Sequence, residues 1–264
     1  MPQFAPTRRT RLPAIRALPT RKGRLGYVLS GHGPAHVVLF SGAGMSLQGW
    51  EPLYPGVERI ARVLGWNRFG LPGSDRPRGP QTGSHVVASL RELLAATHLA
   101  PPYVLVAHSV GGLYANLFAR LHPEEVAGVL FIEATHPGDP LVLKKHATQV
   151  ERALSRVLAL PNALLRPNLH SELAGVEQTV REIEAAGSFP DVPLRVLTGG
   201  LTPRAWLMSP AAVGARRANQ QELARLSPRG EQVIAQKSGH FPQLTEPRLV
   251  LRVLEELIVE VRTA

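Results

Sequence analysis

The feature that most constrains the fold is an apolar run that ends in a serine followed by small residues. Residues 103–107 are rich in β-branched side chains and show no polar alternation, which predicts a strand buried on both faces. Leucines spaced four apart over residues 113–121 then predict a helix packed against the same sheet. Ser109 would lie in the tight, strained turn between them, where Ala107 and Gly111 leave the necessary room. The first N–H groups of the following helix could stabilise the oxyanion that forms when a serine attacks a carbonyl group. Ser109 is therefore a candidate nucleophile.

The composition narrows the class of protein. A chain of 264 residues suits one α/β domain with an insertion. It contains no cysteine, which excludes disulfides, thiol catalysis and cysteine-based zinc sites. No apolar stretch approaches the roughly 20 residues that span a bilayer, so we expect no integral membrane association. Arg8-Arg9 is followed by no apolar core, which disfavours a secretory or twin-arginine signal and makes the cytoplasm the expected location.

Positive charge is concentrated near the amino end. The formal net charge is +10, residues 1–50 contain no acidic residue, and seven Lys/Arg lie between Arg8 and Arg24. Such a segment can bind nucleic acid or an anionic membrane. However, arginine outnumbers lysine 26 to 4 beside abundant alanine, glycine and proline, a skew more typical of coding bias. We therefore expect residues 1–23 to be a solvated basic arm and expect no nucleic-acid partner.

Predicted strands and helices alternate along most of the chain, which favours a parallel sheet with helices on both faces. The predicted strands cover residues 24–29 (at a sheet edge), 37–40, 60–66, 103–107, 127–132, 194–197 and 232–235. The predicted helices cover residues 86–96, 113–121 and 218–226, and a terminal helix starts at Arg248.

Residues 137–190 interrupt this alternation. One helical face is formed by Val150, Leu154, Val157 and Leu158, and a second is formed by Val176, Val180 and Ile183. We expect this segment to be a helical cap or lid, inserted into an α/β core made of residues 24–136 and 191–264.

Five motifs follow one another in a characteristic order. They are Ser-Gly-Ala-Gly (41–44), Asn-Arg-Phe-Gly-Leu-Pro-Gly-Ser-Asp (67–75), Ala-His-Ser-Val-Gly-Gly (107–112), Glu-Ala-Thr-His-Pro (133–137) and Ser-Gly-His-Phe-Pro-Gln-Leu (238–244). By these motifs the chain resembles the α/β-hydrolase superfamily from about residue 24 to its end. The resemblance implies a mostly parallel twisted sheet of about eight strands with flanking helices and a cap. It also implies hydrolysis through a serine, an acid and a histidine, with no cofactor and no metal.

The base in such a site must reach Ser109. Of ten histidines, His240 follows a short strand, is preceded by Gly239 and precedes the terminal helix, which matches the catalytic-histidine loop of the superfamily. His108 is expected to pack or hydrogen-bond, because it leaves the turn on the opposite side from the serine. His136, near the same sheet edge, is the alternative base.

The acid must hold the imidazole in the correct tautomer. Most of the superfamily places it after the strand predicted at 194–197, but this chain has no Asp or Glu between Asp191 and Glu222. Glu133, at the end of the next strand after the nucleophile, occupies an alternative position used by some members. We therefore predict Glu133 as the acid, with Asp139 as the second choice; a salt-bridged strand end is the structural alternative for Glu133.

The oxyanion hole needs two N–H donors aimed at the tetrahedral intermediate. One is expected from Val110. The resemblance assigns the other to Ala43, in the loop that stands in for the superfamily's His-Gly-x-Gly, with Met45 less favoured. Arg68 and Asp75 are interpreted as loop-bracing residues.

The expected activity is hydrolysis of carboxylic esters with small to medium hydrophobic groups. Alternatives on the same triad are C–C bond, lactone or amide hydrolysis, perhydrolysis, or a slow-turnover small-molecule receptor. Dehalogenase and epoxide-hydrolase activities are disfavoured, because those members carry an aspartate where Ser109 stands.

Overall fold

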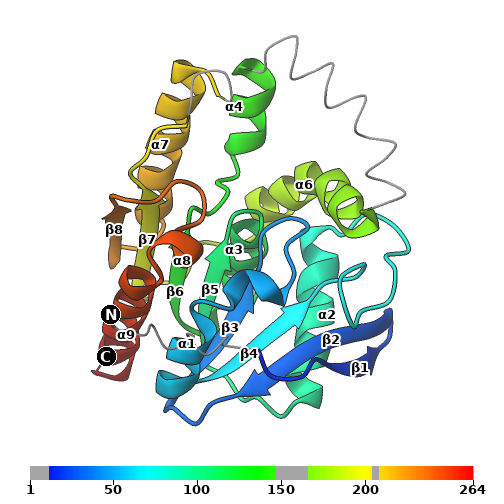
Figure 1. Ribbon diagram of the computed structural model, residues 1–264. Coiled ribbons are helices and arrows are strands. Elements are labelled where there is room, and N and C mark those ends of the chain that lie inside the picture. The colour runs from blue at the N-terminus through cyan, green and yellow to red at the C-terminus, as the bar shows by residue number, and fades with distance from the viewer. Residues whose placement is uncertain (1–11, 147–165, 204–207, 264) are drawn as a thin grey trace, which may run out of the picture.

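The computed structural model describes residues 12–146, 166–203 and 208–263, and an eight-stranded sheet forms its centre (Figure 1). The strands are β1 (Arg16–Thr20), β2 (Gly23–Ser30), β3 (Ala35–Phe40), β4 (Ala61–Asn67), β5 (Tyr103–His108), β6 (Val126–Ile132), β7 (Leu194–Gly199) and β8 (Gly230–Ala235). Their order is β1-β2-β4-β3-β5-β6-β7-β8. The β1–β2 and β2–β4 pairs are antiparallel and the others parallel, which confirms the predicted fold class.

Helices lie on both faces of this sheet. They are α1 (Tyr54–Ile60), α2 (Gly83–Ala96), α3 (Gly111–Leu121), α4 (Asp139–His146), α6 (Pro167–Ala185), α7 (Pro210–Ala224), α8 (Pro242–Thr245) and α9 (Pro247–Thr263), with 3-10 turns at Leu47–Trp50 and Pro123–Glu125. The central strand β5 explains the layering, because Leu105 and Ala107 join the cluster under α2 and α3 while Val104 and Val106 join the cluster under α1 and α9. None of the described helices combines the length and the apolar character needed to cross a membrane.

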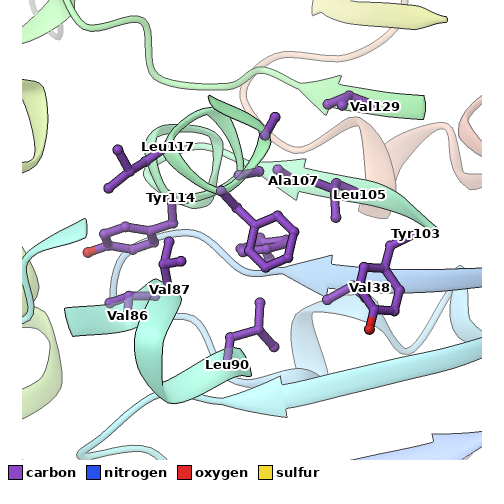
Figure 2. Close-up of a cluster of buried hydrophobic side chains, with 14 of the residues drawn as sticks. Val38, Val86, Val87, Leu90, Tyr103, Leu105, Ala107, Tyr114, Leu117 and Val129 are labelled. Atoms are coloured by element: carbon purple, nitrogen blue, oxygen red, sulfur yellow. The ribbon is translucent and has the colours of Figure 1, made fainter. Parts of the chain in front are cut away.

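Figure 2 shows the cluster that fixes α3, the helix behind Ser109, against the sheet. Tyr114 of α3 lies beside Val86 and Val87 of α2, and all three side chains are at most 3% exposed. Burying a side chain of this size stabilises the fold by about 1.5–3 kcal/mol. The turn that carries Ser109 is therefore held by a rigid core on the helix side.

The amino-terminal segment differs from the expectation. Residues 16–20, within the predicted basic arm, form β1, which pairs with β2 and places the Arg16 guanidinium 5.5 Å from the centre of the Tyr27 ring. The sheet edge is therefore β1, not residues 24–29. The strand is mostly exposed, so it lacks the apolar alternation that predicts strands, and its proline is tolerated because it lies on an edge.

The predicted cap is described in two parts, α4 and α6. The predicted helical face at Val150, Leu154, Val157 and Leu158 lies outside the described residues. Helix α6 contains the second predicted face, and its Ile183 is buried in the same cluster as α2 and α3. In Figure 1, α6 lies across the end of the molecule where α3 begins.

Candidate active site

Ser109 lies in a sharp turn between β5 and α3. Its φ is 53°, a left-handed value that non-glycine residues rarely adopt. A Cβ at Gly111 would lie 2.4 Å from the Phe40 carbonyl oxygen, so only glycine fits two residues after the serine. The structure thus has the strained strand-to-helix turn that the sequence predicts around Ser109.

His240 lies in the loop that follows β8, and its imidazole faces the serine. Its Nε2 is 3.0 Å from Ser109 Oγ, although 131 residues separate the two in the sequence. The Glu246 carboxylate fixes the start of this loop by accepting hydrogen bonds from the Lys237 amide at 2.9 Å and the Ser238 hydroxyl at 2.6 Å. The distance between Nε2 and Oγ suits direct proton transfer from the hydroxyl to the ring.

Glu133 follows β6 and contacts the other side of the same imidazole. Its Oε2 is 3.3 Å from His240 Nδ1, slightly longer than the 2.6–3.2 Å typical of a well-formed pair. Its Oε1 accepts a 2.7 Å hydrogen bond from the Gly199 amide, and Arg216 lies 3.6 Å from Oε2. The structure therefore connects Ser109, His240 and Glu133 through two side-chain contacts of the same imidazole ring.

The surroundings of Glu133 favour its charged form. Burial alone would raise the pKa of this carboxyl, but the hydrogen bonds from His240 and Gly199 and the charge of Arg216 outweigh it and hold the pKa below its usual value. The side chain is therefore an anion at neutral pH. An anion at this position stabilises the imidazolium that forms when His240 takes up a proton.

The alternative acid and base lie elsewhere. Both carboxylate oxygens of Asp139 are engaged, one with the His136 amide at 2.9 Å and the other with the Asn219 side chain at 2.7 Å. The His136 ring accepts a hydrogen bond from the Gly138 amide at 2.9 Å. These contacts fix the start of α4 and do not include Ser109 or His240.

His108 packs directly against His240. The two imidazole centres are 4.9 Å apart, and His108 Nε2 is 2.7 Å from the backbone carbonyl of His240. A carbonyl only accepts hydrogen bonds, so Nε2 carries the proton and donates it. Burial and the neighbouring His240 lower the pKa of His108 to about 3, so its ring is neutral and positions the His240 loop.

This depressed pKa predicts a pH-dependent stability. His108 titrates near pH 6.5 in the unfolded chain and at about 3 in the folded one. Between these values the unfolded state binds the extra proton, so the free energy of unfolding falls as the pH is lowered, by at most about 1.4 kcal/mol per pH unit. Urea unfolding of His108→Gln, whose amide can still donate to the carbonyl, should show a shallower loss between pH 6 and pH 4. Parallel slopes for the variant and the wild type would contradict this role.

The loop after β3 lies against the nucleophile. A Cβ at Gly42 would lie 3.1 Å from Ser109 Cβ, so the glycine allows this close approach. The Met45 amide donates to the Gly42 carbonyl at 3.1 Å, which makes it a poor oxyanion donor. Among the described residues, no hydrogen bond uses the Val110 or Ala43 amide. These two N–H groups, predicted as the oxyanion hole, stay available.

Two side chains near the site, Arg216 and Glu172, were not predicted. Arg216 of α7 contacts Glu133, and Glu172 of α6 forms a buried ion pair with Arg68. The position of Glu172 offered a signal, since it lies four residues before Val176 on the apolar face of a predicted helix. Asp75 does brace its loop, accepting hydrogen bonds from the Arg24 amide at 2.8 Å and the Arg24 side chain at 3.0 Å.

The chain is similar to several known proteins. An uncharacterized protein of Schizosaccharomyces pombe is 40% identical over 88 residues, which is 33% of this chain but 16% of that protein. The pimeloyl-(acyl-carrier protein) methyl ester esterase of Klebsiella pneumoniae (strain 342) is 27% identical over 253 residues, covering 82% of this chain and 91% of the enzyme. A provisionally assigned lipase of Acinetobacter baumannii AYE superposes with a TM-score of 0.72 at 18% identity, over 95% of this chain and 92% of that one.

The match to a family model is broader than the match to the S. pombe relative. The model of the alpha/beta hydrolase fold covers residues 35–204, which include β3 through β7, Ser109 and Glu133. The chain therefore belongs to the alpha/beta hydrolase fold family.

Proposed function

We propose that this protein is a serine hydrolase that cleaves carboxylic esters through Ser109, His240 and Glu133. The observation that carries the proposal is the relay in which His240 lies 3.0 Å from the Ser109 hydroxyl and 3.3 Å from Glu133. A serine is a weak nucleophile unless a base takes its proton, and this arrangement supplies both the base and its orienting acid.

The proposed reaction has two halves. His240 Nε2 removes the hydroxyl proton as Ser109 Oγ attacks the ester carbonyl, and the amides of Ala43 and Val110 stabilise the oxyanion. The imidazolium then gives its proton to the leaving alcohol, which leaves an acyl-enzyme. A water molecule, deprotonated by the same histidine, attacks the acyl group, and collapse of the second intermediate releases the acid and restores the serine. No step requires a cofactor.

The side chains around the relay support a hydrophobic ester as substrate. A pocket beside Glu133 and His240 has one apolar part, and its lining residues include Leu201, Met208 and Val213 together with the polar Thr198, Arg216, Arg217 and Gln220. The Leu201 side chain is 55% exposed, so apolar surface borders the site. The Klebsiella relative is named for hydrolysis of a methyl ester, which agrees with ester chemistry. We further propose that residues 137–190 cap this substrate region.

Fluorophosphonate labelling and p-nitrophenyl ester hydrolysis test the proposal together. A fluorophosphonate should modify one residue, Ser109, and peptide mapping should locate it. Multiple turnovers on acetyl to decanoyl esters should follow Michaelis–Menten kinetics. Labelling of Ser109 without turnover beyond one equivalent would favour the receptor alternative, and no reaction in either assay would overturn the proposal.

Helix α6 should influence which ester is preferred. Leu169 lines a pocket together with Ala43 and Gly44, and a Cβ at Gly44 would lie 3.3 Å from the leucine side chain. Leu169→Ala should change the ratio of kcat/KM between long and short acyl esters by about tenfold, the lower end of the effect of one methylene group in an apolar pocket. Leu173→Ala, on the same helix but 53% exposed, is the matched control. Equal ratios in both variants would place the acyl group elsewhere.

A further inference from the structure

A buried ion pair lies directly behind the loop that carries the second oxyanion donor. Arg68 is 2% exposed and Glu172 is fully buried. The Arg68 guanidinium donates through Nη1 to the Ser41 carbonyl at 2.8 Å and through Nη2 to the Gly42 carbonyl at 2.7 Å. Its Nε donates to Glu172 of α6, and Tyr114 packs against it with its ring centre 5.3 Å away. The guanidinium thus binds two successive peptide carbonyls in one fixed orientation.

This contact, together with the Met45 amide that donates to the same Gly42 carbonyl at 3.1 Å, fixes the orientation of the Ala43 amide. The carbonyl of Gly42 and the N–H of Ala43 belong to the same planar peptide unit, and in the trans form they point in opposite directions. Because Arg68 holds the Gly42 carbonyl, the Ala43 N–H points away from Arg68. Gly42 itself lies against Ser109, so the rigidly oriented peptide unit adjoins the nucleophile.

Glu172 fixes the loop on the other side of Ala43. Its Oε2 accepts a 2.9 Å hydrogen bond from the Gly44 amide, while Oε1 accepts from Arg68 and, at 2.9 Å, from the Asn168 side chain. The peptide carbonyl before Ala43 and the amide after it are therefore both held by the same ion pair. The Ala43 N–H lies between these two anchors.

An ion pair in this position is a costly means of stabilising a fold. Removing both charges from water carries a desolvation penalty that their attraction often only balances, so apolar residues of similar volume commonly stabilise a core as well or better. What apolar residues cannot supply is a planar fork of donors that fixes a peptide plane. Preorganised donors are what an oxyanion hole requires, because a donor that must reorient during the reaction loses much of its effect.

We propose that Arg68, held by Glu172 of α6, is the positioning residue that aims the Ala43 N–H at the oxyanion. The inference rests on the proposed function, and it goes beyond it by linking helix α6 to the rate of the chemical step. Neither side chain is assigned contact with the substrate. Both act through the backbone of residues 41–44.

The test uses two variants of the full chain. Arg68→Met/Glu172→Gln removes both buried charges together, so that neither is left unpaired, and its glutamine can still accept from the Gly44 amide. Arg68→Lys keeps a cation beside Glu172 but cannot bind both carbonyls. In both variants kcat for a p-nitrophenyl ester should fall by about 10²-fold, the scale of a lost oxyanion donor, while KM changes by less than about threefold.

A transition-state analogue separates positioning from a merely structural role. An alkyl trifluoromethyl ketone forms a serine adduct with an oxyanion, so its affinity should fall by the same factor as kcat/KM in each variant. The matched control is Arg91→Met/Glu125→Gln, which removes an ion pair between α2 and the turn before β6, away from residues 41–44, and should keep wild-type kcat and ketone affinity. Thermal melting identifies any variant whose loss of activity reflects unfolding, and Arg68→Lys provides the measurement if the double variant does not fold.

The outcomes distinguish this inference from the proposed function. A wild type that hydrolyses esters beside a folded Arg68→Lys that keeps its kcat and ketone affinity would overturn the inference alone. Equal losses in kcat and in affinity for a non-covalent product acid would also overturn it, because they indicate a general distortion of the site. A wild type with neither turnover nor labelling would overturn the proposed function and this inference with it.

Discussion

Ser109→Ala is expected to lower kcat for ester hydrolysis by on the order of 10⁴ to 10⁶-fold and to abolish fluorophosphonate labelling. The hydroxyl is the atom 3.0 Å from His240 Nε2, and alanine offers nothing for the base to activate. The residual rate reflects binding and the oxyanion hole, which do not depend on the nucleophile. Steady-state kinetics and mass spectrometry of the labelled protein measure both effects.

A second serine replacement controls for this experiment. Ser89 lies on α2, is 3% exposed, and its hydroxyl donates to the His85 carbonyl at 2.9 Å. Ser89→Ala should keep both labelling and turnover, because it removes a buried hydroxyl remote from the relay. If the Ser109 variant retained labelling at another serine, the nucleophile would have been assigned to the wrong residue.

The parts of the site that sequence predicted are those with a local signal. The turn at Ser109 is marked by an apolar strand, two small residues and a helix within 20 positions, and each of these has a physical cause in the structure. Glu133 was predicted because the loop after β7 has no carboxylate and because the resemblance gives this strand end as an alternative position for the acid. The end of β7 still contacts Glu133, because the Gly199 amide donates a hydrogen bond to its carboxylate.

The parts that could not be predicted are contacts between side chains far apart in the chain. Arg68 and Glu172 are separated by 104 residues, and although the position of Glu172 on an apolar helical face indicates burial, it does not indicate which residue pairs with it. The pairing depends on how α6 is placed across the end of the sheet domain, and no local pattern encodes that placement. The edge strand β1 was missed for a different reason, since an exposed, charged strand has no apolar face to form a pattern.

Glu133→Gln is expected to lower kcat by up to about 10⁴-fold. The carboxylate accepts a hydrogen bond from the protonated Nδ1, which leaves Nε2 unprotonated and free to take the serine proton. An amide nitrogen facing the ring would instead favour the opposite tautomer. The charge is lost as well, so the imidazolium is less stable. Glutamine is close in size to glutamate, and its oxygen can still accept from the Gly199 amide, so packing changes little.

Asp139→Asn is the matched control for Glu133→Gln, because it neutralises another buried carboxylate beyond the same strand. Asp139 binds the His136 amide and the Asn219 side chain, so its loss should affect the start of α4 and the thermal stability more than kcat. Melting curves recorded beside the kinetics distinguish a change of the His240 tautomer from a loss of stability at the strand end.

Should Asp139→Asn lower kcat as much as Glu133→Gln while both variants stay folded, the acid would not be Glu133 alone. If Glu133→Gln kept wild-type kcat, the contact of Glu133 with His240 would have only a structural role, like that of Asp139 with His136. We favour Glu133 as the acid for two reasons. Its Oε2 lies 3.3 Å from His240 Nδ1, and its other partners, Gly199 and Arg216, keep the carboxylate charged where the imidazolium forms.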